Sequence, residues 1–290
     1  MSAYEASLLT LVAINVMLAL SLNLITGLCG QVSLGHAAFF CVGAYATALL
    51  AKAGYGLWLT APASIVFAGI VGIVIGLCSL RVRDDFLAIA TMGAGFLVVG
   101  IVRTNEALGG ELGISQIPSP WMPTSWLADS FWLVTCVAAA GVGLVCWWVK
   151  KSWLGYAFEA VGADEVAARG VGIDVAHYKL AAFAIGTGLA GLAGCLYAYY
   201  LTSVGPEAFG FPVSVMILAM VVVGGMGSLV GSVLAAAILT LLPEWIRFVN
   251  DYKLLVFGLL LFATMRFFPQ GLYPPLANLL GSLRRSGSGA

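Results

Sequence analysis

Residues 150–179 read KKSWLGYAFEAVGADEVAARGVGIDVAHYK, and they form a polar interval in a chain that is otherwise almost continuously apolar. The interval mixes apolar residues with charges of both signs, whereas a flexible linker would be rich in Ser, Gly and Pro. This composition predicts an ordered unit of two short helices and a turn. We interpret it as a rigid, water-facing surface for a partner. An amphipathic helix lying on the membrane surface is the alternative.

Capping residues define the two ends of this unit. Asp164 is placed to cap a helical turn, and Asp174 is placed to cap the long apolar helix that follows. Glu165 and Arg169 are four residues apart with the acid first, which favours an ion pair on one helix face. Gly170 then supplies the expected helix stop.

Composition predicts an all-α polytopic membrane helix bundle. Charged residues are 9% of the 290 residues and apolar residues are 61%, whereas a typical soluble domain has about 25% charged residues. The formal net charge is zero, so we expect the lipid bilayer and no nucleic acid as a partner. The six cysteines lie in apolar runs without metal-binding spacing, so we expect core packing and no metal site.

Hydropathy divides the chain into nine apolar segments, so we expect one transmembrane domain over residues 1–290 with about nine crossings, some broken or re-entrant. The segments are 6–26, 34–51, 57–80, 86–104, 131–149, 179–203, 211–224, 229–243 and 254–268. The seventh and eighth are short for a layer of ~30 Å, and the count has a range of roughly eight to ten. Glycines at 224–227 predict that these two helices meet within the membrane, and glycines at 27–35 predict a re-entrant segment. The same pattern in both halves suggests an internal repeat.

Lys and Arg give the expected orientation, because cytoplasmic loops carry an excess of both. With 150–179 inside, nine basic residues fall inside and four outside. Those inside are Arg81, Arg83, Lys150, Lys151, Arg169, Lys179, Arg266, Arg284 and Arg285, and those outside are Lys52, Arg103, Arg247 and Lys253. We therefore expect a cytoplasmic C-terminal tail at 267–290. The N-terminus would be external, unless a re-entrant segment at 27–35 reverses it.

Ser33 and His36 are the candidate path-lining residues, because polar side chains at membrane depth usually face a cavity or are buried in protein. A hydrolase is disfavoured, since the other histidine, His177, lies at the end of a helix and no oxyanion donors accompany it. No acidic residue lies in the middle of a predicted span, which counts against an ion-coupled carrier. No G-x-x-x-x-G-K-[ST] motif occurs, so we expect neither catalytic residues nor an ATP site on this chain.

The apolar segment after residue 179 carries small residues with a period of four. They are Ala182, Gly186, Ala190, Gly194 and Ala198. Such a stripe lets another helix approach closely. We predict that it packs against a helix instead of lipid, and that it carries movement from the polar interval into the bundle.

The run EVAARGVGI at 165–173, followed by YKLAAF and then AGLAG at 190–194, resembles the membrane subunits of branched-chain amino acid ABC importers. GQVSLGHAAFFCVGAY at 30–45, GGELGISQIP at 109–118 and PQGL at 269–272 extend the resemblance over most of the chain, in the right order. They resemble the LivM-type subunit more than its paired homologue. In that family the counterpart of residues 150–178 is the loop that docks on the ATPase.

The resemblance implies a permease subunit in the bacterial inner membrane that works with a homologous permease subunit, two cytoplasmic ATPase subunits and a periplasmic substrate-binding protein. ATP and Mg would be bound by the ATPase partners, with no cofactor on this chain. ATPase movement would act on the docking residues Asp164, Glu165, Ala167, Ala168, Arg169 and Gly172.

The implied cargo is leucine, isoleucine, valine or a related amino acid. Family members often have Gly and Tyr where this chain has Asp84 and Phe86, and a small residue where it has Glu111. Closely similar subunits serve urea and short-amide importers, which are the alternative. A stand-alone secondary transporter or facilitator is the alternative from another class.

Overall fold

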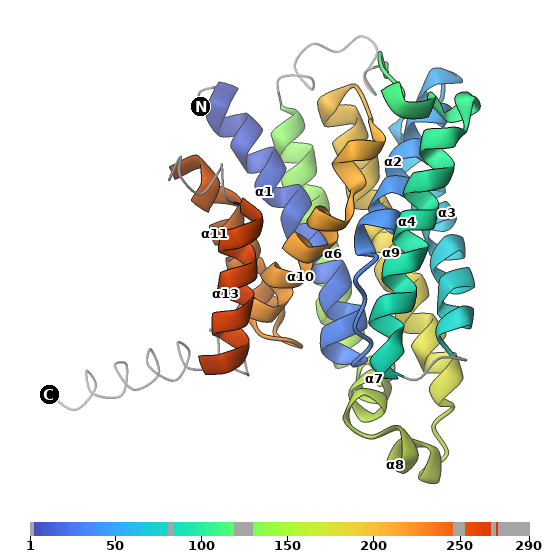
Figure 1. The fold of residues 1–290 in the computed structure, drawn as a ribbon, viewed down its shortest axis with the longest axis vertical. Coiled ribbons are helices and arrows are strands. Elements are labelled where there is room, and N and C mark those ends of the chain that lie inside the picture. Colours follow the sequence, from blue (N-terminus) through green and yellow to red (C-terminus); the bar gives the residue numbers. More distant parts are fainter. Residues whose placement is uncertain (1–2, 81–83, 119–129, 246–252, 268–270, 272–290) are drawn as a thin grey trace, which may run out of the picture.

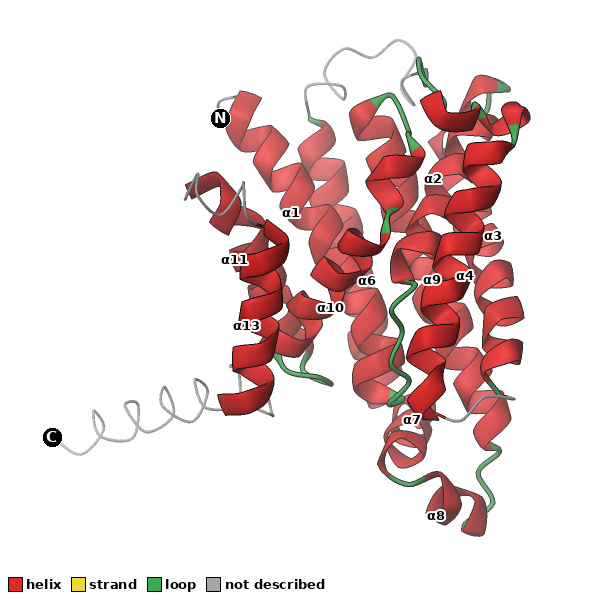
Figure 2. Cartoon of the chain, viewed as in Figure 1, coloured by secondary structure: helices red, strands yellow, loops and turns green. Residues whose placement is uncertain are grey.

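The computed structural model describes residues 3–80, 84–118, 130–245, 253–267 and 271, and these residues are predominantly helical (Figure 2). No strand occurs among them, apart from an isolated antiparallel bridge between Ile114 and Val204. The first half contains α1 (Ala3–Leu22), the π-helical η1 (Asn23–Leu28), α2 (His36–Lys52), α3 (Leu57–Ser79) and α4 (Asp84–Thr104). The short η2 (Glu106–Leu108) and η3 (Gly110–Leu112) precede α6 (Phe131–Lys151), α7 (Trp153–Ala163) and α8 (Glu165–Gly170). The second half contains α9 (Val175–Leu201), η4 (Pro206–Phe209), α10 (Phe211–Gly224), α11 (Leu229–Trp245) and α13 (Lys253–Phe267).

Six helical stretches within the described residues are long and apolar enough to cross a membrane. They are Tyr4–Leu28, Leu57–Cys78, Phe86–Thr104, Phe131–Lys151, Val175–Leu201 and Pro206–Gly224. Three further apolar helices are shorter, namely His36–Lys52, Leu229–Glu244 and Leu255–Phe267. The chain is therefore an all-helical polytopic bundle. The predicted tail at 267–290 lies outside the described residues, apart from Phe267 and Gly271.

Helices α1 and α9 form the centre of the bundle. The most apolar windows of the spans that contain them are 72% and 67% buried, whereas the corresponding values for α3, α4 and α6 are 28%, 17% and 22%. Since the exposed faces of these outer helices are apolar, they suit contact with lipid or with another membrane subunit. Figure 1 shows α7 and α8 projecting from one end of the bundle, and the N-terminus at the opposite end.

The small-residue stripe of α9 is buried along its length. A Cβ at Gly186 would meet Ile25 and the backbone of Ser21, whereas a Cβ at Gly194 would meet the backbone of Phe40 and Ala44. The stripe therefore lies against α1 and η1 near one end and against α2 near the other. Close approach is possible because the residue with no side chain sits at each crossing.

Both halves of the chain contain a helix that begins inside the bundle after a non-helical stretch. Residues 29–35 lead into α2, and residues 202–210, with the short η4, lead into α10 (Figure 2). The two starts meet, because Ala37 N donates to Ser214 Oγ at 3.0 Å. Helices α1 and α9 run in opposite directions (Figure 1), and each packs against the pair of helices that follows the other, α10 and α11 or α2 and α3. This arrangement has the form of an inverted repeat.

The prediction that the helices at 211–224 and 229–243 meet within the membrane is wrong. The turn between α10 and α11 lies at the end of the bundle, where Lys150, near the end of α6, donates from Nζ to Gly227 O at 2.6 Å. Gly225 and Gly227 have φ angles of 100° and 79°, so the glycines serve this tight turn. The interruption inside the bundle lies at the other end of α10, before Phe211.

Candidate functional site: the α7–α8 unit and the broken helices

The unit formed by α7 and α8 is capped as its sequence predicts. Asp164 Oδ1 accepts from the backbone N–H groups of Val166 and Ala167 at 2.8 and 3.0 Å. Asp174 Oδ1 accepts from Ala176 N and His177 N at 3.1 and 3.3 Å, at the start of α9. These bonds satisfy N–H groups that a helix leaves free at its first turn.

Helix α8 ends at Gly170, but the glycine that the turn requires is Gly172. Its φ is 85°, in the left-handed region. Gly172 N donates to Arg169 O, and Ile173 N donates to Ala168 O, both at 3.0 Å. This pair of bonds is the Schellman motif, in which glycine occupies the position after the cap. The sequence prediction therefore placed the helix end correctly, but the glycine with the left-handed conformation is Gly172 and not Gly170.

Glu165 connects α8 to the start of α9. Its carboxylate forms the predicted pair with Arg169, at 3.3 Å, and a second ion pair with Lys179 Nζ. Lys179 is only 8% exposed, so its charge is held inside the unit. The second pair was not anticipated, because residues 165 and 179 belong to different helices and no local spacing brings them together. Glu165 is therefore a structural residue of the unit, whatever docks on it.

Apolar side chains on this unit face outward. Val166 and Val171 are 79% and 78% exposed, although they lie on a polar segment that projects beyond the bundle. Trp153 and Tyr156 on α7 are also exposed. Ala168, by contrast, is buried against the core. Of the predicted docking residues, Ala168 is buried and supports the unit from inside. The others are fully or partly exposed, so a partner could contact them.

The α7–α8 unit directly contacts the non-helical residues 29–35 that lead into α2, which we call the first broken segment; residues 202–210 are the second. A Cβ at Gly162, near the end of α7, would lie 2.9 Å from Leu28 O and 3.2 Å from Gly30 N. Gly30 has a φ of 74° and approaches Gly162 in turn. Asn23 accepts from Gly227 N at 2.8 Å and so fixes the base of the same segment to the α10–α11 turn. The chain that leads into α2 is therefore held at its base by α7 and by the α10–α11 turn.

Ser33 and His36, the predicted path residues, are both fully buried between helices of this one chain. His36 Nε2 shares a hydrogen bond of 2.7 Å with Ser21 Oγ on α1. Ser33 Oγ and His36 Nδ1 have no hydrogen-bond partner among the described residues. This face of the segment looks toward α1, so His36 helps to hold the start of α2 in place. A substrate path along these two side chains stays a prediction.

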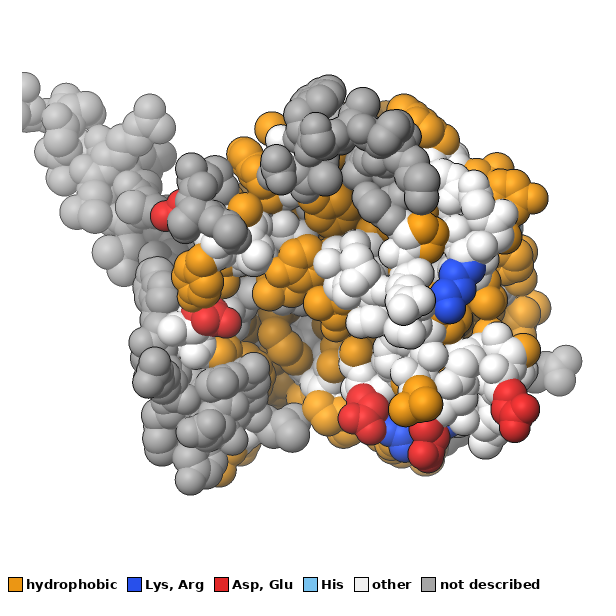
Figure 3. All heavy atoms as spheres, turned by 90° about the horizontal axis from the view of Figure 1, so that it is seen from above, with side chains coloured by type: hydrophobic (Ala, Val, Ile, Leu, Met, Phe, Trp, Pro, Cys, Tyr) orange, Lys and Arg blue, Asp and Glu red, His pale blue; other side chains and the backbone are white. Residues whose placement is uncertain are grey.

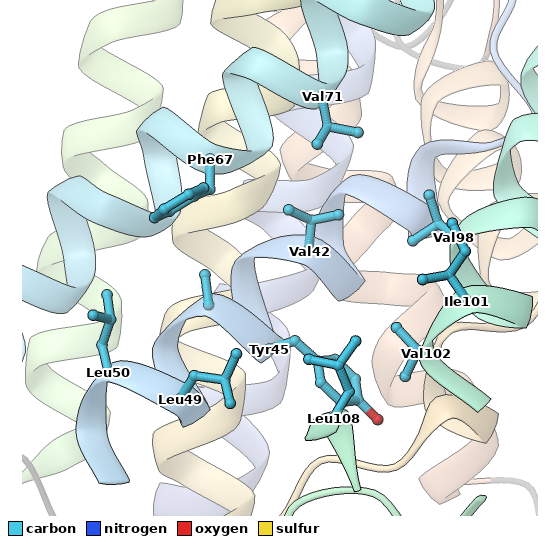
Figure 4. A pocket seen from close by; sticks show the side chains of 11 residues that line it. Val42, Tyr45, Leu49, Leu50, Phe67, Val71, Val98, Ile101, Val102 and Leu108 are labelled. Carbon is cyan, nitrogen blue, oxygen red and sulfur yellow. The ribbon is translucent and has the colours of Figure 1, made fainter. Parts of the chain in front are cut away.

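Within the described residues, two cavities lie beside α4. The larger, of 500 Å³, lies between α2, α3 and α4 and has an apolar lining that includes Phe67, Leu49 and Ile101 (Figure 4). Tyr45 contributes the one hydroxyl there, and it donates to Val204 O at 3.3 Å. The smaller cavity, of 270 Å³, lies between α4, η4 and α10, and Leu34 on the first broken segment also lines it.

No group of three or more His, Cys, Asp or Glu side chains that would hold a metal ion occurs within the described ranges.

The arrangement of the α7–α8 unit and the broken segments favours a mechanical role. It combines a capped, outward-facing unit, a direct contact from that unit to a broken helix, and a cavity at the far side of the break. Such an assembly is suited to passing a movement from the projecting unit to the interior of the bundle.

Comparison with known proteins gives a consistent result. A family model described as branched-chain amino acid transport system / permease component matches residues 5–265. The chain is 37% identical over 292 residues to the high-affinity branched-chain amino acid transport system permease protein LivM of Escherichia coli (strain K12), covering 91% of this chain and 69% of the relative. LivM of Salmonella typhimurium (strain LT2) is 36% identical with the same coverage.

A more distant relative is the autoinducer 2 import system permease protein LsrC of Escherichia coli (strain K12 / DH10B). It is 26% identical over 279 residues, which cover 89% of this chain and 73% of the relative. No solved structure gives a significant match.

Proposed function

The chain belongs to the branched-chain amino acid transport system permease family and is a permease subunit of an ABC importer, and on that premise we propose that it forms half of a translocation path for branched-chain or related amino acids. A homologous permease subunit would supply the other half. The relatives whose names specify branched-chain amino acids are the basis for this cargo.

The α7–α8 unit is the proposed docking surface for a cytoplasmic ATPase subunit. The observation that carries this assignment is the exposure of Val166 and Val171 on a capped unit outside the bundle. Apolar side chains that are exposed to water on an ordered helix gain free energy when a partner covers them. Two ATPase subunits, which would bind ATP and Mg, complete the cytoplasmic side, and a periplasmic binding protein would deliver substrate at the opposite end.

The proposed topology has nine crossings, with α7 and α8 in the cytoplasm of a bacterial inner membrane. The six long spans and three shorter apolar helices support this count. Helix α8 and the ends of α6 and α13 lie at the same end of the bundle (Figure 1), and they carry Lys150, Lys151, Arg169 and Arg266, as expected for a cytoplasmic face. Helix α13 ends at this same end (Figure 1), which supports a cytoplasmic C-terminus and an external N-terminus as part of the proposal.

The test is a double variant, Val166→Glu with Val171→Glu, studied in proteoliposomes with the partner subunits. Because both side chains are exposed, each substitution should change the stability of the permease by less than about 0.5 kcal/mol. Placing two carboxylates in an apolar interface should weaken ATPase binding by roughly thirtyfold or more, as for a hot-spot residue. We expect normal insertion and normal pairing with the homologous permease, but loss of ATPase association and of ATP-dependent leucine uptake.

The matched control is Tyr55→Glu. Tyr55 is 51% exposed at the opposite end of the bundle, so it carries the same kind of change away from the proposed surface. It should bind the ATPase and transport normally. Wild-type ATPase association in the double variant would refute the docking role, whereas wild-type transport without ATP would overturn the importer mechanism itself.

A further inference from the structure

The cavity of 270 Å³ runs along one face of α4. Met92, Phe96, Val99 and Arg103 line it at intervals of three or four residues, which is the spacing of one helix face. From Met92 to Arg103 this face extends about 16 Å, at ~1.5 Å per residue. This face of α4 begins at the level of Leu34, inside the bundle. It ends at the end of α4 that is remote from α7 and α8. The cavity is therefore a vestibule on the proposed periplasmic side.

The walls of the vestibule are apolar and its outer rim is charged. Phe96 and Phe211 stack across it, with ring centroids 6.1 Å apart and an interplanar angle of 28°. At the rim, Arg103 Nη2 lies 3.8 Å from Glu207 Oε1 on η4. Seen from this end, acidic and basic side chains gather along one edge of the bundle (Figure 3).

The ion pair at the rim is weak and open to exchange. The side chains of Arg103 and Glu207 are 47% and 87% exposed, and their separation is long for a hydrogen bond. Exposed pairs of this kind contribute little stability because water screens both charges. A ligand that carries both a carboxylate and an ammonium group can therefore satisfy both partners, at little cost, when the pair opens.

We propose that this vestibule is a transient binding site for the zwitterion of an α-amino acid with a branched apolar side chain. Arg103 would bind the carboxylate and Glu207 the ammonium group, while the side chain enters between Val99, Phe96 and Phe209. The inference rests on the proposed function and deepens it, because it assigns part of the cargo selectivity to the permease itself.

The composition of the site discriminates between the cargo alternatives. A branched aliphatic side chain gains free energy when the apolar walls remove it from water. Urea or a short amide would leave its polar groups without partners between Val99, Phe96 and Phe209, and it offers no charge to Arg103 or Glu207. None of the described residues that line the larger cavity beside α4 is charged, so that cavity does not fit a zwitterion.

The site can be tested by cysteine protection in the complete transporter, reconstituted in proteoliposomes without binding protein. Val99→Cys places a thiol in the vestibule, and Ile101→Cys places one in the neighbouring apolar cavity, two residues along the same helix. The exposed Cys78 and the half-buried Cys136 are first replaced by serine. A membrane-impermeant maleimide is added outside, with leucine, leucinamide, 4-methylpentanoate or urea as the competing ligand.

We expect leucine to protect the cysteine at position 99 and not the one at position 101. Leucinamide lacks the carboxylate and 4-methylpentanoate lacks the ammonium group, so each should protect about tenfold less, the factor expected when a charged hydrogen bond is lost. Urea should not protect. Arg103→Gln should reduce protection by leucine to the level of leucinamide, and Lys52→Gln, which removes an exposed cation at the same end, should leave it unchanged.

Two results would overturn the site: no protection by leucine at position 99, or equal protection in the Arg103→Gln variant. ATP-dependent leucine uptake by the wild-type transporter, measured in parallel, separates this inference from the proposed function. Uptake without protection removes only the vestibule site, whereas absence of uptake with all partners present removes the proposed importer function.

Discussion

Replacing Gly162 by alanine should uncouple ATP hydrolysis from transport, because it places one methyl group between α7 and the start of the first broken segment. The added Cβ would lie 2.9 Å from Leu28 O, 3.1 Å from Cys29 C and 3.2 Å from Gly30 N. Carbon contacts are optimal near 3.5–4.0 Å, so the two backbones must separate by about 0.5 Å. Backbone atoms line the contact on both sides, so no flexible side chain can move aside.

The magnitude follows from two opposing terms. Overpacking costs roughly 1–3 kcal/mol, and the loss of glycine freedom in the unfolded chain returns about 0.4–1 kcal/mol. A net cost of about 1–2 kcal/mol should leave the subunit folded, and it corresponds to roughly a tenfold shift of a conformational equilibrium that requires the closed contact. We therefore expect leucine uptake per ATP hydrolysed to fall several-fold to about tenfold.

The measurement is the ratio of leucine uptake to ATP hydrolysis in the same proteoliposomes, normalised to the amount of inserted subunit. Gly170→Ala is the matched control, because a Cβ there has no atom within 4 Å and the residue is exposed on the neighbouring helix. The reasoning is refuted if Gly162→Ala transports with the wild-type ratio. It is refuted equally if Gly170→Ala uncouples to the same degree, since the effect would then arise at the docking surface.

The remaining predictions concern topology and packing. Cysteines introduced at Ala163, the last residue of α7, and at Ala176, in the first turn of α9, are both exposed and should react with an impermeant maleimide from the cytoplasmic side only, and labelling from the periplasmic side would reverse the assigned orientation. Gly194→Leu should lower the yield of folded subunit, since the backbone of α2 occupies the space and overpacking typically costs ~1–3 kcal/mol. Gly141→Leu, at an open position on α6, is its control, and an equal yield of both variants would show that the small-residue stripe is incidental.

Local features of the α7–α8 unit could be predicted from sequence because neighbouring residues form them. The caps at Asp164 and Asp174 and the pair of Glu165 with Arg169 depend only on spacing along the helix. The second partner of Glu165, Lys179, could not be predicted, because the fold brings it in from the next helix. The same reason explains why Ala168 was predicted as a docking residue although it is buried.

Hydropathy predicted the helical segments well, but it could not place the breaks in depth. It measures how apolar a stretch is, and an extended stretch that is buried in protein is as apolar as a helix. Residues 202–210 were therefore assigned partly to a continuous segment and partly to a loop, whereas they form the second interruption of the bundle. The vestibule could not be predicted from sequence either, because Leu34, Val99 and Phe209 are distant along the chain and meet only in the fold.

The two broken segments connect the proposed docking surface to the proposed substrate site. Gly30 contacts α7 at the base of the first segment, and Leu34, four residues later, lines the vestibule. Ala37 then bonds to Ser214 on α10, which lines the vestibule from the second half. A displacement at Gly30 must therefore change the vestibule wall unless residues 31–33 absorb it. Ser33 is fully buried in that interval, and Gln31 N donates a hydrogen bond to Ile25 O at 3.2 Å. Residues 31–33 therefore have little freedom to absorb a displacement.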